Sequence, residues 1–375
     1  MSDGATRHSW FQRFLLPGFA FKAVVIGGGY ATGREIAEFF LPAGPWGGLF
    51  AMVVAMLLWS GIAAITFAFA HATHTRDYRS FFKALLGRAW FVFDLAYAVF
   101  VVLILAVFGA AAGAIGAAAF GLPPLVGTVA LMAGIAACVA FGNRSVERAF
   151  AWISILLYGV YAIFFVLALT RFGDRIATTF AAAGPPESGW LSGGIAYASY
   201  NIIGAVVVLP VTRHLTSRRD AVVAGLVSGP LAMLPALLFF LCMTAFSAEV
   251  AGAALPSDYL LTRLGSPAFH ILFQLMIFAA LLESGSGAVH AINERIAGVA
   301  HAAGRPLGVV ARALIALALL AFCMLLADRF GLVALIASGY RALAWTLLAV
   351  FVVPLLLIAP ARLLKAPREP APEVA

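Results

Sequence analysis

Charged and polar side chains stand inside segments of this sequence that are otherwise apolar. Lys22 and Arg341 each lie within a long apolar run, and Glu283 shares one helical face with Ser286 and His290. Arg341 lies about ten residues into its run, which at 1.5 Å per residue places it near the middle of a bilayer. Because a charged side chain at that depth is costly, we expect these residues to have a function.

Glycine interrupts the first of these apolar runs. Three consecutive glycines begin at Gly27, and each costs up to about 1 kcal/mol relative to alanine inside a helix. Thr32 and Glu35 then match the S/T-x-x-E capping box, in which Glu35 reaches back to the N–H of Thr32. The pattern predicts a helix that ends near Ile26 and a new one that starts near Thr32, halfway across the membrane.

A break at this depth has a physical consequence. Non-helical backbone survives within a bilayer only where it faces protein or a watery cavity, and its freed N–H groups attract anions. A glycine-rich packing face between helices is the alternative interpretation. We favour the break, and we expect its solute-binding residues to be Gly27, Gly28, Gly29, Tyr30, Thr32 and Gly33.

A second, weaker interruption lies near the middle of the sequence. The segment 193–204 places glycines and Asn201 inside a run of membrane length, and Pro210 follows near its end. An asparagine is costly in hydrocarbon unless it is paired. The residues expected to bind solute here are Tyr197, Ser199, Tyr200, Asn201 and Gly204. The aromatic side chains that could wall the pocket and contact a cationic solute are Tyr30, Tyr197, Tyr200 and Trp345.

Charged residues also cluster around the first break. Those expected to act in gating or as intramembrane charges are Arg34, Glu35, Glu38 and Arg341. Arg34 and Glu38 share a helix face at i,i+4 and can simply pair with each other. Arg341 can pair with Glu38, with Glu35 or with a solute carboxylate, and the sequence leaves these alternatives open.

These residues belong to about ten apolar runs, each long enough to cross a hydrocarbon core of ~30 Å. Hydrophobic residues make up 63% and charged residues 11% of the 375 residues, and the mean hydropathy is +1.02. Soluble domains carry about 25% charge, so the composition excludes that class. The expected spans are 14–40, 47–70, 90–118, 125–141, 149–169, 190–211, 221–246, 268–298, 309–327 and 332–357.

The basic residues give the spans an orientation. Seventeen of the 24 lysines and arginines fall in one set of alternating connections, and only four fall in the other. The positive-inside rule then places both termini in the cytoplasm, and we expect a multi-pass protein of the bacterial cytoplasmic (inner) membrane. The net charge of +8 is therefore a topology signal and not the footprint of nucleic-acid binding.

The halves of the chain match in their organisation. Five spans precede a central connection and five follow it. Each half opens with an interrupted helix, and these two helices run in opposite directions. That is the pattern of an inverted-repeat transporter with its site at the midplane. The expected units are a cytoplasmic segment 1–12, a first repeat 13–170, an outer connection 171–189, a second repeat 190–358 and a disordered cytoplasmic tail 359–375.

The segment Gly27–Phe40, GGGYATGREIAEFF, resembles a known signature. It is similar to the first-helix pattern G-A-G-[FY]-A-[ST]-G-Q-E-I-x-x-F-F of YkvI-type membrane proteins, which belong to the amino acid–polyamine–organocation superfamily. The resemblance implies an all-α LeuT-like fold with a five-plus-five inverted repeat and discontinuous first and sixth helices. Arg34 departs from the usual glutamine, so a polar contact made there would differ.

The resemblance also implies a position for a coupling cation, between the inner part of the first helix and the eighth helix. Transferred to this sequence, the surrounding residues are Lys22, Gly27, Glu283, Ser284 and Ser286. A Lys22–Glu283 pair would carry a proton, whereas serine hydroxyls and backbone carbonyls would bind sodium. A purely structural ion pair is the alternative.

The function expected from these features is secondary active transport of a small polar or zwitterionic solute, such as an amino acid, coupled to a proton or a sodium ion. The partners are then that solute and the lipid bilayer, with no nucleic acid. A channel or a non-transporting membrane sensor on the same scaffold is the alternative. We expect no enzyme, because the sequence lacks converging nucleophiles or metal ligands, and no cofactor or metal. The sequence does not indicate the oligomeric state.

Overall fold

The computed structural model describes residues 9–141, 144–302 and 304–365, and the regular structure within these ranges is helical. Short 3-10 or π-helical stretches carry the label η. The first half contains η1 (Phe11–Leu15), α1 (Leu16–Val25), α2 (Gly28–Ala31), α3 (Arg34–Phe39), η2 (Leu41–Ala43), α4 (Gly44–Ala72), α5 (Tyr78–Leu86), η3 (Gly87–Ala89), α6 (Trp90–Phe120), α7 (Pro124–Phe141) and α8 (Arg144–Ala182).

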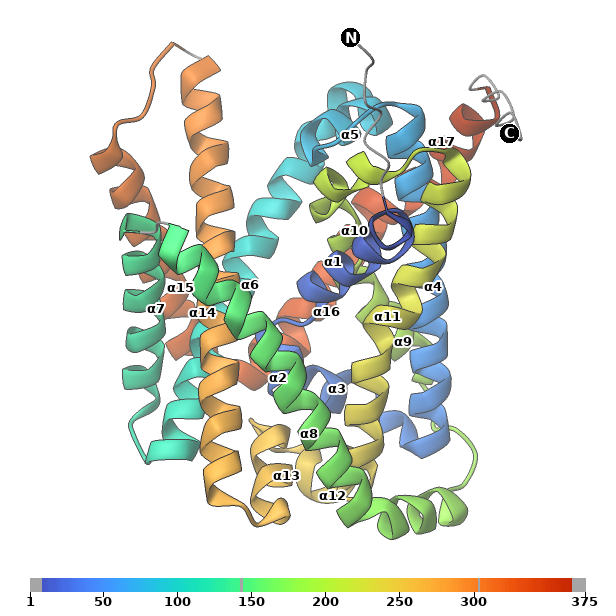
Figure 1. Cartoon of the computed structure of the whole chain (residues 1–375), viewed down its shortest axis with the longest axis vertical. Coiled ribbons are helices and arrows are strands. Elements are labelled where there is room, and N and C mark those ends of the chain that lie inside the picture. The colour runs from blue at the N-terminus through green and yellow to red at the C-terminus, as the bar shows by residue number, and fades with distance from the viewer. Residues whose placement is uncertain (1–8, 142–143, 303, 366–375) are drawn as a thin grey trace.

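The regular structure described in the second half is also helical. It contains α9 (Trp190–Asn201), α10 (Gly204–Val207), η4 (Leu209–His214), α11 (Arg218–Thr244), α12 (Ser247–Ala251), α13 (Pro256–Leu264), α14 (Pro267–Ala302), α15 (Val309–Ala334), η5 (Leu335–Tyr340), α16 (Arg341–Leu347), η6 (Leu348–Val352) and α17 (Val353–Lys365). In Figure 1, α5 and the end of α17 lie at one end of the molecule, and α12 and α13 lie at the other.

The long helices have the length and composition of membrane spans. Six stretches of the described chain are long and apolar enough to cross a bilayer, and 124–140 is a shorter apolar helix. The longest, 309–364, contains two crossings, because Gly331 has a left-handed backbone (φ 70°) that separates α15 from the helices after it. The expected all-α polytopic membrane architecture is therefore confirmed.

Apart from the shorter helix 124–140, two expected crossings do not meet this length criterion, and they are those predicted to be interrupted. In the first, α1 stops at Val25, Ile26 leaves the helical region (ψ 77°), and two short helices, α2 and α3, follow. In the sixth, α9 stops at Asn201 and gives way to α10 and η4. Figure 1 shows α2, α3, α9 and α16 meeting near the middle of the molecule.

The segments outside the spans differ in part from expectation. Helix α8 continues to Ala182, through most of the segment expected as an outer connection, because its sequence there contains no proline before Pro185. A further outer connection, between the seventh and eighth expected spans, carries the short helices α12 and α13. Helix α17 runs to Lys365, into the expected tail. The remainder of that tail and residues 1–8 lie outside the described residues.

Glycine allows α4 and α11 to pack backbone against backbone. A Cβ atom built at Gly225 would lie 2.3 Å from the Cα of Ala64, and one at Gly229 would lie 2.4 Å from the carbonyl oxygen of Met56. Ser60 adds a hydrogen bond from its hydroxyl to the carbonyl of Leu226, at 2.9 Å. Small residues at such contacts are the usual means of tight helix association in membranes.

This packing predicts the effect of adding a single methyl group. Gly225→Ala should destabilise the protein by about 1–3 kcal/mol, because the new Cβ overlaps the α4 backbone and overpacking outweighs the gain in helix propensity. Gly61→Ala is the matched control, since nothing lies within 4 Å of a Cβ built at Gly61. Apparent unfolding temperatures in detergent should fall for the first variant and hold or rise for the second; equal temperatures would contradict the packing argument.

Candidate functional site

The break in the first helix is held by hydrogen bonds from within and from a distant segment. The hydroxyl of Thr32 donates to the carbonyl of Gly29 at 2.9 Å, and the N–H of Gly33 donates to the carbonyl of Tyr30 at 2.9 Å. The N–H of Ser257, in α13, donates to the carbonyl of Thr32 at 3.0 Å. The carbonyls of Gly29, Tyr30 and Thr32 are therefore paired with protein, as a low-dielectric interior requires.

The predicted capping box at this break forms only in part. Helix α3 begins after Gly33, whose left-handed backbone (φ 79°) makes it the N-cap. The hydroxyl of Thr32 still accepts from the N–H of Arg34 at 3.4 Å while it donates to the carbonyl of Gly29. Glu35 instead lies over Gly29, where a built Cβ would come 2.3 Å from its Oε1 atom.

Glu35 lies among tyrosines from three other elements. Its side chain is buried (3% exposed), and its Oε2 atom accepts a 2.5 Å hydrogen bond from the hydroxyl of Tyr200 in α9. The ring of Tyr200 contacts the rings of Tyr197 and Tyr340, with centroids 5.6 and 4.6 Å apart. Tyr30 in α2 is fully buried nearby, within electrostatic range of Glu35. We call these five residues the Glu35 cluster.

Two hydroxyl groups of the Glu35 cluster have no hydrogen-bond partner in the described chain. They belong to Tyr30 and Tyr197, and the hydroxyl of Tyr161 in α8, which acts electrostatically on Tyr30, is a third. Buried hydroxyls without a partner cost about 1–3 kcal/mol each, and they are rare in folded proteins. A polar molecule seated among them would remove that cost.

The second break faces the first. Gly204 lies against α1, where a built Cβ would come 3.0 Å from the ring of Phe21. Asn201 donates to the carbonyl of Tyr197 at 3.2 Å, and Ser199 donates to the carbonyl of Ile195 at 2.7 Å. These polar side chains therefore bond to their own helix, whereas Tyr197 and Tyr200 project toward Glu35.

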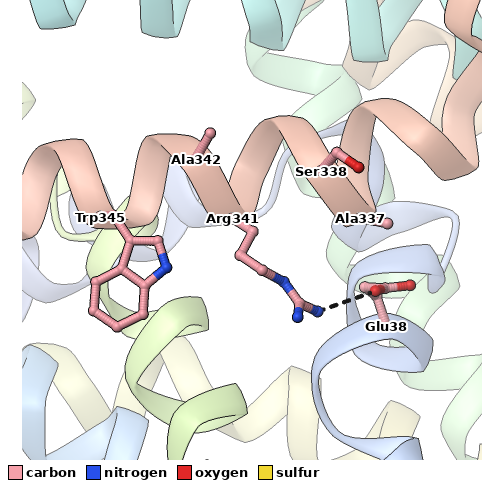
Figure 2. A pocket seen from close by; sticks show the side chains of 6 residues that line it. All are labelled: Glu38, Ala337, Ser338, Arg341, Ala342 and Trp345. Carbon is pink, nitrogen blue, oxygen red and sulfur yellow. Dashed lines mark hydrogen bonds and ion pairs between the residues drawn. The ribbon is translucent and has the colours of Figure 1, made fainter.

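A cavity of about 530 Å³ lies beside the first break, with Arg341 and Trp345 of α16 and Glu38 of α3 in its wall. Figure 2 shows the side chains that line it. Glu38 pairs with two arginines, with Arg34 at 3.0 Å and with Arg341 at 3.4 Å. The pairing of Glu38 with Arg34 and its pairing with Arg341, which the sequence left open, therefore occur together. Arg341 is 56% exposed, so it lies in the cavity wall and not in the protein interior.

Arg34 has a further task in this network. It is buried, and its Nη1 atom donates to the carbonyls of Ala251 at 2.6 Å and Ala253 at 3.0 Å. These carbonyls belong to the end of α12 and the turn after it. Arg34 therefore ties α3 to the outer connection, which is a contact that the usual glutamine of the signature is too short to duplicate with the same geometry.

Two residues of the expected cation position lie near the same tyrosine. The Nζ atom of Lys22 lies 4.1 Å from the ring centroid of Tyr158, and Glu283 acts electrostatically on Tyr158. Ser286 donates to the carbonyl of Leu282 at 2.7 Å, within its own helix, and Ser284 is half-buried. The Lys22–Glu283 pair stays a prediction.

Several residues of the site were not found by sequence reasoning. Tyr340, Tyr161 and Trp59 were all missed; the indole of Trp59 donates to the carbonyl of Ala198, next to the second break, at 3.1 Å. Tyr340 follows Gly339 and directly precedes the intramembrane charge Arg341, so its sequence neighbours could have identified it as a site residue. Tyr161 and Trp59 lie in uninterrupted apolar helices and offered none.

The turn at Gly33 predicts a second stability effect. Gly33→Ala should cost about 1–3 kcal/mol, because alanine disfavours this left-handed backbone and its Cβ would lie 2.6 Å from the ring of Phe239. Gly121→Ala is the control: Gly121 has a similar φ of 64°, with nothing within 4 Å of a built Cβ. Thermal unfolding should show a clearly larger loss at position 33; equal losses would show that the contact with Phe239 is unimportant.

Comparisons with known proteins agree with this description. No family model matches the chain. It is 24% identical over 290 residues to the uncharacterized membrane protein YkvI of Bacillus subtilis (strain 168), covering 74% of this chain and 79% of YkvI.

Two solved structures share the fold over nearly the whole chain. MhsT in complex with L-phenylalanine has a TM-score of 0.61 at 17% identity, covering 96% of this chain and 98% of that one. The H236A mutant of the Eremococcus coleocola manganese transporter has a TM-score of 0.59 at 12% identity, covering 95% and 81%. The resemblance to YkvI-type proteins and the LeuT-like fold expected from the first helix are therefore confirmed: this chain is a LeuT-like, multi-pass membrane protein.

Proposed function

We propose that the chain is a secondary active transporter of a small polar or zwitterionic solute, such as an amino acid. The observation that carries the proposal is the Glu35 cluster: a buried carboxyl group and two partnerless phenol hydroxyls, enclosed between two discontinuous helices. Discontinuous helices near the bilayer midplane are where transporters of this architecture bind solute. The shared fold with a transporter bound to L-phenylalanine and with a manganese transporter supports this function and not an enzyme.

Solute would bind among Tyr30, Tyr197, Tyr200 and the backbone of 27–33. The ion pairs of Glu38 with Arg34 and Arg341 would close the outer path above it. Arg34 and Glu38 both belong to α3, whereas Arg341 belongs to α16 in the other half of the chain. Motion of one half against the other would therefore break the Glu38–Arg341 pair. That provides a physical route to alternating access.

The coupling ion is part of the proposal. A proton or a sodium ion would be used, with the inner-side group Lys22, Glu283, Ser284 and Ser286 as one possible location. We also propose that the protein resides in a bacterial inner membrane with its termini in the cytoplasm. This orientation is supported by the bias of basic residues and by the position of α5 and the end of α17 at one end of Figure 1.

Transport in proteoliposomes tests the proposal. Radiolabelled amino acids, L-phenylalanine among them, are offered under imposed pH or sodium gradients, with protein-free liposomes as the control. At least one solute should enter saturably and depend on a gradient. Uptake of none of them, or ion currents faster than a carrier allows, would contradict it and favour the sensor or the channel.

Tyr197→Phe separates a binding role from a structural one. Because the Tyr197 hydroxyl has no hydrogen-bond partner among the described residues, its removal should raise the stability of the solute-free protein by about 1 kcal/mol while weakening solute binding by about tenfold. Tyr259→Phe, which removes an exposed hydroxyl bonded to Arg263, should leave binding unchanged. Thermal shift with and without solute measures both effects, and a variant with lost stability and unchanged affinity would count against the site.

A further inference from the structure

We propose that the Glu35 carboxylate is the shared site of the coupling proton and of the ammonium group of the solute, so that each solute molecule bound releases one proton. This inference rests on the proposed function and sharpens it. It selects the proton over sodium, places the proton at Glu35 and not at Lys22 and Glu283, and predicts exchange of proton for solute instead of their common entry.

The position of Glu35 allows both ligands to reach it. Its carboxyl group folds back over Gly29, in the break of the first helix, because the absence of a side chain there leaves room for Oε1. Its other oxygen accepts the hydrogen bond from Tyr200, in the helix that opens the second half. The carboxyl group therefore lies between the two discontinuous helices, where a bound solute would also lie.

The described residues supply no positive charge to this carboxyl group. Within the described ranges, no lysine, arginine or histidine forms an ion pair with Glu35, and its neighbour Arg34 is bound to Glu38 and to the carbonyls of Ala251 and Ala253. Helices α2, α9 and η5 present phenols to it, from Tyr30, Tyr197, Tyr200 and Tyr340.

The remaining described elements around α3 bring no cation to Glu35 either. Arg341 of α16 pairs with Glu38, and helix α11 presents the ring of Phe239. The nearest charged groups of the outer connection pair elsewhere, Glu249 with Arg175 and Asp258 with His270. An unpaired carboxylate at this depth carries a desolvation cost of several kcal/mol. It must be neutralised, by a proton in the solute-free protein or by a cation that the solute brings.

The surroundings suit an ammonium group. Such a group has three N–H donors and no acceptor, and the site offers the carboxylate together with the partnerless oxygens of Tyr30 and Tyr197. The tilted ring of Tyr340 and the edge-on ring of Tyr197, both beside Tyr200, provide π-systems of the kind that stabilise ammonium ions. Oxygen acceptors and aromatic faces thus converge on one carboxylate.

The exchange balances in atoms and charge. A protonated Glu35 and an incoming R–NH₃⁺ give a Glu35 carboxylate paired with R–NH₃⁺, and the released proton passes to water on the side to which the site is open. When the solute leaves on the other side, Glu35 takes a proton from that side. One carboxylate cannot hold both cations, so the exchange is one for one.

Proton release on binding tests this directly. Purified protein in weakly buffered detergent solution, containing a pH-indicator dye, is titrated with L-phenylalanine and 2-phenylethylamine, and with 3-phenylpropanoate, which lacks the ammonium group. We expect about one proton released per bound amine and none with 3-phenylpropanoate. Glu35→Gln should abolish release and weaken amine binding at least about tenfold. Glu35→Asp should retain release, and Glu249→Gln, at an exposed ion pair, should match the wild type.

Each contrary result has a distinct meaning. Amine binding by the wild type without proton release, release that persists in a folded Glu35→Gln protein, or tight binding only of 3-phenylpropanoate would overturn the exchange. The proposed transport function would stand in those cases if uptake in proteoliposomes is observed. Neither binding nor uptake of any compound offered would overturn the transport function and the exchange together.

Discussion

The rest of this structure depends on one constraint: polar groups in the middle of a membrane protein must be satisfied by protein or by something that the protein binds. The first helix is interrupted between Ile26 and Gly33, so several backbone groups lose their helical partners. A threonine hydroxyl and the N–H of Ser257 satisfy the carbonyls of Gly29 and Thr32. The outer helices α12 and α13 are therefore part of the site's construction and not simple connections.

The same constraint identifies what the protein leaves unsatisfied. Several backbone groups at the two breaks have partners, whereas the hydroxyls of Tyr30 and Tyr197 have none within the described residues. The carboxyl group of Glu35 accepts from the hydroxyl of Tyr200 and from the backbone of Tyr30. Buried polar groups that lack a partner are positioned for a ligand, and they are the physical basis for placing the solute there.

Much of the architecture could be predicted from the sequence. Apolar runs define the membrane crossings. Glycine and asparagine inside two of these runs mark the interrupted helices, because they are unfavourable in an unbroken helix that crosses hydrocarbon. The sequence left three candidate partners for Arg341 and could not decide among them. In the structure, Glu38 pairs with both Arg34 and Arg341. Distances between spans, and not local pattern, decide such pairings.

Two features could not have been predicted in this way. The capping box forms only in part, because the left-handed backbone of Gly33 lies between Thr32 and the start of α3. The tyrosines that surround Glu35 come from α2, α9 and η5, and their convergence depends on how two halves of the chain pack. Sequence spacing within one helix contains no information about that packing.

The central claim is that the Glu35 cluster opens to the two sides of the membrane in turn. The most direct test places a single cysteine at Tyr30 in a protein whose Cys138, Cys242 and Cys323 have been replaced, and measures labelling by a membrane-impermeant thiol reagent in vesicles of each orientation. The account predicts labelling from both sides, slowed by a transported solute. Protection from both sides under every condition, with or without solute, would contradict it.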